Sequence, residues 1–242
     1  MSTNRTVPNA RQRAHEAVSA DIVTEARRQI GEVGAGALSL RSVARELGMA
    51  SSAMYRYFPS RDDLLTTLIV EAYDALGEAA ELAATTSDRA FPRWQAVCRA
   101  VRRWAFAHPQ EYALIYGSPV PGYRAPDITV APGSRVTLVL AHLLDDAQLA
   151  GELGPINGPA PSRALLNVVR PIAQLTMPDV SLAHVAVGLL AWTQLFGQIN
   201  FELFGRYEGV LENPELLFEQ AVTTMAWAVG LTPRRTGRAG SS

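Results

Sequence analysis

The chain has 242 residues, 48 % of them hydrophobic and 19 % charged, which excludes a disordered polymer and allows a substantial core. A single cysteine, Cys98, excludes an intramolecular disulfide and a cysteine-based metal cluster. The net charge of −1 is unevenly distributed: residues 1–61 carry nine arginines against five acids, and the rest carries thirteen against eighteen. A basic N-terminal part joined to an acidic body suggests two different tasks.

The apolar pattern is helical almost throughout, without strand-like alternation. In the first predicted helix apolar residues recur every four positions, and a Gly-Ala-Gly sequence ends it. In chain order, the predicted helices span Ala10–Val33, Leu40–Leu47, Ser51–Phe58, Arg61 to about Ala84, Pro92–His108, Pro109–Tyr116, Ser134–Leu149, Ala164–Gln174, Ser181–Phe204 and Asn213–Val229. Residues 1–9 are predicted to be a disordered arm and residues 232–242 a flexible tail.

The sequence predicts neither a signal peptide nor a membrane-spanning helix. Residues 1–20 hold no apolar stretch of signal-peptide type, so we expect a cytoplasmic protein. The apolar segment Leu182–Phe204 is interrupted by Gln194, Gln198 and other polar residues, whereas a span needs roughly 20 nearly unbroken apolar residues. It therefore predicts a buried helix.

Residues 39–63 read SLRSVARELGMASSAMYRYFPSRDD and have the spacing of a helix-turn-helix. Ala44 is the small residue needed where two helices cross, and Gly48 suits a turn with positive φ. Ser51 is a plausible N-cap of the second helix, and Ser60 with Asp63 predicts a capping box for the next one. The inward stripe consists of Val43, Leu47, Met54 and Phe58.

The outward residues of the second short helix suit DNA recognition, because a helix fits the major groove and its first residues meet base edges. The hydroxyls of Ser51 and Ser52 can donate and accept hydrogen bonds. Arg56 can bind guanine with two hydrogen bonds. The hydroxyls of Tyr55 and Tyr57 suit phosphate oxygens.

Residues 21–65, centred on LRSVARELGMASSAMYRYFPSRDDLL, resemble the DNA-binding domain of the TetR family of transcription regulators. The resemblance includes the Leu-Gly turn, the Tyr-x-Tyr-Phe end of the recognition helix and the Arg-Asp-Asp-Leu-Leu start of the fourth helix. It implies an all-α fold, with an N-terminal three-helix DNA-binding domain and a larger helical domain for ligand binding and dimerisation. The implied domains are 10–60 and 61–231.

Positions that match the family's DNA-contacting residues are Ser39, Arg41, Ser51, Ser52, Tyr55, Arg56, Tyr57 and Arg61. Two of them have an open structural alternative. Tyr55 could instead pack against the first helix of the motif, and Arg41 could belong to a solvated helix face.

The segments 108–117 and 191–205 resemble a C-terminal class named for Trp, His and Gly residues. Trp192 and Gly197 fit this pattern, but Phe196 stands where the histidine is expected, which puts a histidine-dependent ligand contact in doubt. The aromatic residues of this half suit an apolar effector pocket, although such stripes usually form core. The candidate ligand-binding residues are Trp104, Tyr112, Tyr116, His142, Arg170, Trp192, Phe196 and Asn200.

Catalysis, metals and cofactors find no support in the motifs. The four histidines lack metal-ligand spacing, no GxSxG elbow is present, and Asp145-Asp146 is typical of a solvated helix face. We therefore expect neither an enzyme nor a cofactor nor a metal site. Cys98 is interpreted as a small apolar helix residue, with a redox sensor as the alternative.

By resemblance, helices over about 181–204 and 213–229 form a homodimer, with a seam of Ala183, Ala186, Val187, Leu190 and Gln194. A two-fold dimer implies double-stranded DNA with a palindromic operator as its partner. We expect a repressor that a small apolar or amphipathic effector releases from its operator. The alternative is a DNA-binding regulator without an effector, controlled by a protein partner or by its own abundance.

Overall fold

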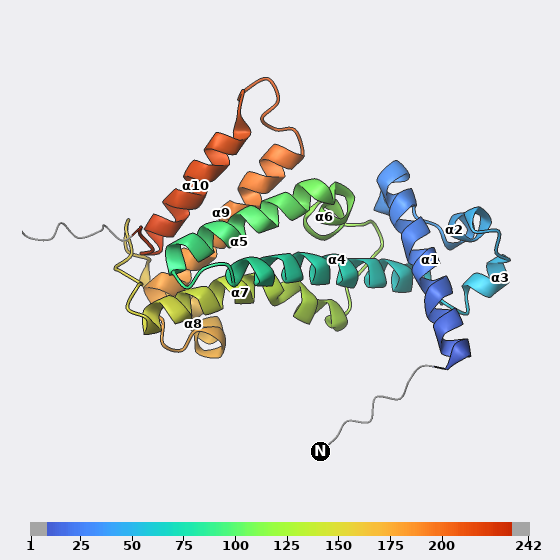
Figure 1. Ribbon diagram of the computed structural model, residues 1–242, viewed down its shortest axis with the longest axis horizontal. Helices are drawn as coiled ribbons and strands as arrows, with labels where there is room; N and C mark the ends of the chain where they lie inside the picture. Colours follow the sequence, from blue (N-terminus) through green and yellow to red (C-terminus); the bar gives the residue numbers. More distant parts are fainter. Residues whose placement is uncertain (1–8, 234–242) are drawn as a thin grey trace, which may run out of the picture. The chain divides into compact units, whose positions relative to one another are not determined.

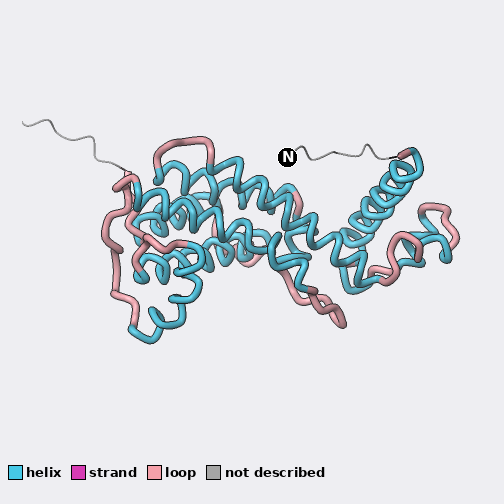
Figure 2. The backbone as a smooth tube through the Cα atoms, turned by 90° about the horizontal axis from the view of Figure 1, so that it is seen from below, coloured by secondary structure: helices cyan, strands magenta, loops and turns pink. Residues whose placement is uncertain are grey.

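The computed structural model describes residues 9–233, and this part of the chain is all-α, with no strand (Figure 1, Figure 2). Most predicted helices form within one or two residues of their expected bounds. The helices are α1 Ala10–Val33, α2 Leu40–Glu46, α3 Ser51–Met54, α4 Arg61–Ala84, α5 Ala90–Ala107, α6 Pro109–Tyr116, α7 Val130–Leu149, α8 Arg163–Thr176, α9 Leu182–Leu203 and α10 Pro214–Ala228. The predicted arm, apart from Asn9, and most of the predicted tail lie outside the described residues.

Two predicted helix bounds were wrong. Helix α3 ends at Met54 rather than Phe58, because the chain continues in tighter turns in which the Tyr57 amide donates to the Met54 carbonyl at 2.9 Å. Helix α7 begins at Val130 rather than Ser134, because Pro132 lies in its first turn, where a missing amide hydrogen costs no helical bond.

The chain folds into two compact units. The first unit contains residues 9–73 and 108–130 of the described chain, and the second contains 74–107 and 131–233. Helix α4 is continuous across the point where the first unit gives way to the second. The functional boundary expected between residues 60 and 61 stays a prediction.

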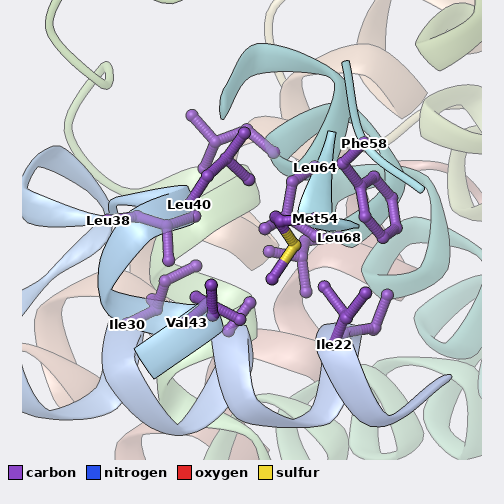
Figure 3. Packing of buried hydrophobic residues seen from close by; sticks show 13 residues of the cluster. Ile22, Ile30, Leu38, Leu40, Val43, Met54, Phe58, Leu64 and Leu68 are labelled. Atoms are coloured by element: carbon purple, nitrogen blue, oxygen red, sulfur yellow. The ribbon is translucent and has the colours of Figure 1, made fainter. Parts of the chain in front are cut away.

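The first unit encloses a hydrophobic core built by α1, α2, α3 and the start of α4 (Figure 3). Ile22 and Leu64 are fully buried in it. Of the predicted inward stripe, Val43, Met54 and Phe58 are buried, whereas Leu47 is only partly buried. Each fully buried side chain contributes about 1.5–3 kcal/mol to folding when it leaves water.

Segment 108–130, which follows α5 in sequence, completes this core rather than that of the second unit. Leu114, Val120 and Tyr123 pack against the cluster. Polar contacts fix the segment further, because Arg27 of α1 forms ion pairs with Glu71 of α4 and with Glu111 of α6. Helix α6 is thus part of the unit that carries the helix-turn-helix.

The second unit is built around α5, α9 and α10, which pack against one another, while α8 packs against α9. The buried Trp94 indole donates a hydrogen bond to the Val222 carbonyl at 3.2 Å and thereby joins α5 to α10. Arg102 of α5 binds both carboxylate oxygens of Glu202 on α9, at 2.9 and 2.6 Å. These contacts fix the face that α9 and α10 present outward.

Helix α9 is the one described helix that is long and apolar enough to cross a membrane by length and composition. Its packing against α5, α8 and α10 explains part of this apolar character, whereas Leu190 and Phe201 are exposed.

Candidate nucleic-acid interface

The turn of the helix-turn-helix has the conformation that the sequence predicted. Gly48 has a φ of +63°, and a side chain there would be strained even though the space around it is open. The Met49 amide donates to the Ala44 carbonyl at 2.8 Å and the Gly48 amide to the Arg45 carbonyl at 3.1 Å, which is a Schellman motif. This motif ends α2 and sets the direction in which α3 begins.

Helix α3 leaves its polar side chains available. Its N-cap is Ala50, so the prediction that Ser51 caps the helix was wrong. Ser51 and Ser52 are both exposed and form no hydrogen bond with the described residues. Arg56 is exposed as well and forms no ion pair within residues 9–233. Helix α3 and the turn that follows it therefore present two hydroxyls and an unneutralised guanidinium to solvent.

The two tyrosines of this segment differ in environment. Tyr55 is 48 % exposed, which argues against the alternative that it packs within the motif. Tyr57 is half-buried, packs against the core cluster, and stacks on His15 of α1 with ring centroids 4.6 Å apart. Its orientation is thereby fixed by α1 as well as by α3.

Arg61 differs most from the prediction of a DNA contact. Its guanidinium donates to the carbonyls of Ala35, Gly36 and Leu38 at 2.9, 3.1 and 3.1 Å. Its donors are thus engaged by the turn that precedes α2, and its side chain is only 28 % exposed. These hydrogen bonds position the turn before α2, and the DNA contact of Arg61 inferred from resemblance stays a prediction.

Helix α2 and the turn after α3 carry free positive charge. Ser39 precedes α2 as its N-cap and Arg41 is exposed without an ion pair among the described residues. By contrast, Arg28 of α1 pairs with Glu25 at 2.7 Å and with Glu32 at 2.5 Å. The hydrogen bond from Arg28 holds the pKa of Glu25 below its ordinary value, so this pair is neutral overall at pH 7.

The candidate ligand-binding residues are divided between the two units. Tyr112 and Tyr116 lie on α6 in the first unit, with ring centroids 5.2 Å apart, and burial raises the pKa of both phenols. His142 and Arg170 are exposed and are not brought together with the buried aromatic residues. The second unit holds the remaining candidates, which are Trp104, Trp192, Phe196 and Asn200.

Trp192, Phe196 and Asn200 recur every four residues and form one stripe along α9. The Trp192 and Phe196 ring centroids are 5.4 Å apart. The Trp192 indole nitrogen and the Asn200 side-chain oxygen are both buried without a hydrogen-bond partner among the described residues. Buried polar atoms are nearly always paired in proteins, so these two atoms are exceptions within the second unit.

A cavity of about 270 Å³ in the second unit lies away from this stripe, against the α7–α8 loop and the residues after α10. It is lined by Arg89, whose charge is neutralised by Glu152. Cys98 is fully buried, and burial raises the pKa of its thiol. This is the environment of a small apolar residue and contradicts the redox-sensor alternative.

A helix-turn-helix with an exposed hydroxyl- and arginine-bearing face, joined by α4 to a second helical unit, defines a DNA-binding transcription regulator. The sequence matches two family models: bacterial regulatory proteins, tetR family, over residues 22–68, and tetracyclin repressor-like, C-terminal domain, over residues 94–225. The chain therefore belongs to the TetR family, whose members bind DNA, act as dimers and are not enzymes.

Relatives and solved structures agree with this assignment. The chain is 37 % identical over 215 residues to the HTH-type transcriptional regulator Rv1816 of Mycobacterium tuberculosis, covering 86 % of this chain and 91 % of that protein. The crystal structure of regulatory protein SCO4313 has a TM-score of 0.73 and 32 % identity, over 90 % of this chain and 98 % of that chain. A tetR-family regulatory protein from Rhodococcus RHA1 shares the fold, with a TM-score of 0.62 and 16 % identity over 89 % and 98 % of the two chains.

Proposed function

We propose that this TetR-family regulator is a dimeric repressor in the cytoplasm that leaves a palindromic operator when a small apolar or amphipathic molecule binds. The DNA-reading half rests on one observation: the exposed hydroxyls of α3 form no side-chain hydrogen bond, and Arg56, in the turn directly after α3, forms no ion pair with the described residues. Such groups are available for base edges and phosphates without first breaking a contact within the protein. The residues proposed to contact DNA are Ser39, Arg41, Ser51, Ser52, Tyr55, Arg56 and Tyr57.

The dimer is proposed to form through the outward face of α9 and α10. Along α9 the exposed or open positions alternate in steps of four and three, as in a helix-packing seam. They are Leu190, Gln194, Gly197, Phe201 and Phe204. Helix α10 adds Leu217 and Trp227, which are 39 % and 51 % exposed.

One residue of the seam expected from sequence is placed differently. Ala186 is 1 % exposed and packs inside the protomer. The proposed seam therefore begins near Leu190 and continues toward Phe204, further along α9 than the sequence suggested.

The effector-binding half is supported by the unpaired atoms of Trp192 and Asn200 on α9. A ligand that pairs with them in one conformer but not the other shifts the conformational equilibrium by its difference in affinity. A hundredfold release from DNA needs about 2.7 kcal/mol of such coupling. Helix α4, which belongs to both units, is the proposed lever.

The second candidate is a regulator without an effector, controlled by a protein partner or by abundance. His142 and Arg170 are exposed, so the candidate ligand site lacks two of the polar groups expected for it, which favours this second candidate. A panel of apolar and amphipathic compounds that leaves operator binding unchanged would support this candidate.

The deciding experiment is fluorescence anisotropy of the purified protein on the DNA that flanks its own gene, across a salt series. Wild type is compared with Arg56→Ala and with Arg124→Ala, an exposed arginine outside the motif. We expect wild type to bind selectively, with an affinity that falls steeply as salt rises. Arg56→Ala is expected to lose this binding and Arg124→Ala to keep it. If a genome-wide selection yields no duplex that the wild-type protein binds more tightly than unrelated DNA, the proposal is contradicted.

A further inference from the structure

The first turns of α1 extend beyond the hydrophobic core of the first unit, and Figure 1 shows them projecting past α2 and α3. Residues 9–17 are all exposed, and the first buried residue of the helix is Ile22. A capping box nevertheless holds the first turn. The Gln12 amide donates to the Asn9 side chain at 2.8 Å, and the Asn9 amide donates to the Gln12 side chain at 3.3 Å. Local hydrogen bonds, rather than burial, keep this extension helical.

The charge on this extension is unfavourable for the isolated helix. Its first turn contains Arg11 and no acidic residue, although the positive end of the helix dipole favours acids there. The guanidinium groups of Arg11 and Arg13 form neither an ion pair nor a hydrogen bond with the described residues. Further along the same helix, Arg27 and Arg28 are paired with carboxylates. The arginines of α1 are thus neutralised beside the core and left free on the extension.

One contact ties the extension to the DNA-reading segment. His15 stacks on Tyr57, with an angle of 17° between the ring planes. Arg11 precedes His15 by four residues, so it lies on the same face of α1, about 6 Å further from the core. Arg13 is two residues from Arg11 and therefore points about 200° away around the helix.

We propose that Arg11 binds a backbone phosphate of the operator, which makes the exposed start of α1 a DNA-contacting element in addition to α2 and α3. The inference rests on the proposed function, because its partner is the same DNA. A guanidinium binds phosphate through two parallel hydrogen bonds, and this contact is independent of base sequence. Stacking of His15 on Tyr57 places Arg11 on the side of α1 that faces the end of the recognition segment.

The test measures the salt dependence of DNA affinity by anisotropy for wild type, Arg11→Gln and Arg13→Gln. Each lost phosphate contact lowers the slope of log affinity against log salt by about 0.9, so Arg11→Gln is expected to lower it by about 1.8 per dimer. Arg13→Gln carries the same change of charge on the opposite face and is expected to keep the wild-type slope. Arg11→Lys, which keeps the charge, is expected to restore most of the slope.

An unchanged slope in Arg11→Gln, or an equal loss in Arg13→Gln, would overturn the proposal. Unrelated duplexes are measured alongside, because phosphate contacts persist on them and the slope comparison remains valid without a selective site. Wild type that fails to select any sequence counts against the proposed function, whereas selective wild type with an unchanged Arg11→Gln slope counts against this inference alone. Thermal unfolding of both variants controls for folding.

Discussion

Arg61 illustrates how a charged side chain next to a DNA-reading surface can serve the protein's own backbone. Its three hydrogen bonds reach carbonyls that lie 23 to 26 residues earlier in the chain. Arg61→Gln is expected to cost about 1.5–3 kcal/mol of stability, the usual range for hydrogen bonds to a charged group. Urea unfolding at fixed protein concentration measures the loss.

A phosphate contact by Arg61 predicts a different outcome. The salt slope of DNA binding would then fall in Arg61→Gln while stability stayed close to that of wild type. Arg41→Gln is the matched comparison, because Arg41 is exposed, has no ion pair among the described residues and is expected to change the slope without changing stability.

Asn200 is a residue whose replacement is expected to stabilise the protein and impair its response. Its buried side-chain oxygen lacks a partner among the described residues, and an unsatisfied buried acceptor costs about 1–3 kcal/mol. Asn200→Leu is therefore expected to raise the stability of the ligand-free protein by about 1 kcal/mol and to abolish release from DNA by the effector.

Gln198 provides the control for this prediction. It lies on the same helix, but its side-chain oxygen accepts a hydrogen bond from the Tyr207 hydroxyl at 3.1 Å. Gln198→Leu removes a satisfied acceptor and is expected to destabilise the protein. A destabilised Asn200→Leu protein in the same unfolding assay would show that the Asn200 oxygen is paired in solution.

At the scale of elements, α4 and α7 are joined by one arginine. Arg135 donates to both carboxylate oxygens of Glu81, at 2.8 and 2.6 Å, and to the Asp74 carboxylate at 2.8 Å. It lies directly over Gly77, where a β-carbon would be 2.7–2.9 Å from its Nε, Cβ and Cδ atoms. The glycine is therefore required by packing between the two helices.

Gly77→Ala tests this arrangement. Helix propensity alone favours alanine by about 1 kcal/mol, whereas overpacking costs about 1–3 kcal/mol. We expect a net loss of thermal stability, because the Arg135 β-carbon cannot move without shifting α7. In an Arg135→Ala background the same substitution is expected to stabilise. If Gly77→Ala alone stabilises the protein, α4 and α7 can move apart at little cost.

The ion pair between α5 and α10 predicts a pH dependence. Hydrogen bonds from Arg99 hold the pKa of Glu219 below its ordinary value. The folded protein therefore binds this proton more weakly than the unfolded chain, so the pair stabilises above about pH 4.3 and loses its effect as pH falls through the lowered pKa. Both side chains are partly exposed, which limits the effect to about 0.5–1 kcal/mol.

Glu219→Gln is accordingly expected to be less stable than wild type at pH 7, and the two are expected to converge only as pH falls through the lowered pKa of Glu219, where the folded carboxylate takes up its proton. Urea unfolding at several pH values measures this difference. Glu212→Gln, at an exposed position without an ion pair among the described residues, is expected to show no such trend. A constant difference at all pH values would mean that packing, not charge, explains the loss.

At the scale of the whole molecule, local patterns sufficed for the helices and for the turn at Gly48, because period and φ preference are properties of short segments. They did not predict that segment 108–130 packs with the first unit, since Leu114 and Tyr123 meet their partners only through tertiary packing. The hydrogen bonds of Arg61 to the carbonyls before α2 were not predicted for the same reason. The early start of α7 is a local effect, because Pro132 fits the first turn of a helix.

In the candidate site, too, some features could be predicted from local sequence and others depend on tertiary packing. The buried stripe that includes Met54 and Phe58 leaves the other side of α3 and of the turn after it exposed, so the exposure of Arg56 and the two serines could be predicted from sequence. The stripe on α9 was recognised only as a set of aromatic and polar residues. Which atoms of Trp192 and Asn200 lack partners depends on neighbouring helices and became visible only in the structure.

The dimer is the property on which the whole function depends, because each protomer reads one half of a two-fold operator. Phe201 is 55 % exposed on the proposed seam of α9. Phe201→Glu places two charges close together in an apolar interface and is expected to yield monomers by sedimentation, with a fold that circular dichroism shows to be intact. Operator affinity is expected to fall by at least a hundredfold, about 2.7 kcal/mol, because the two half-sites are then bound independently.

Leu82 supplies the control, since it is 63 % exposed on α4, outside the proposed seam. Leu82→Glu is expected to remain a dimer with wild-type affinity for DNA. If Phe201→Glu also sediments as a dimer, the interface lies elsewhere and the apolar face of α9 and α10 needs another partner. If it is monomeric yet binds the operator as tightly as wild type, dimerisation through this face is not what positions the two recognition helices on the DNA.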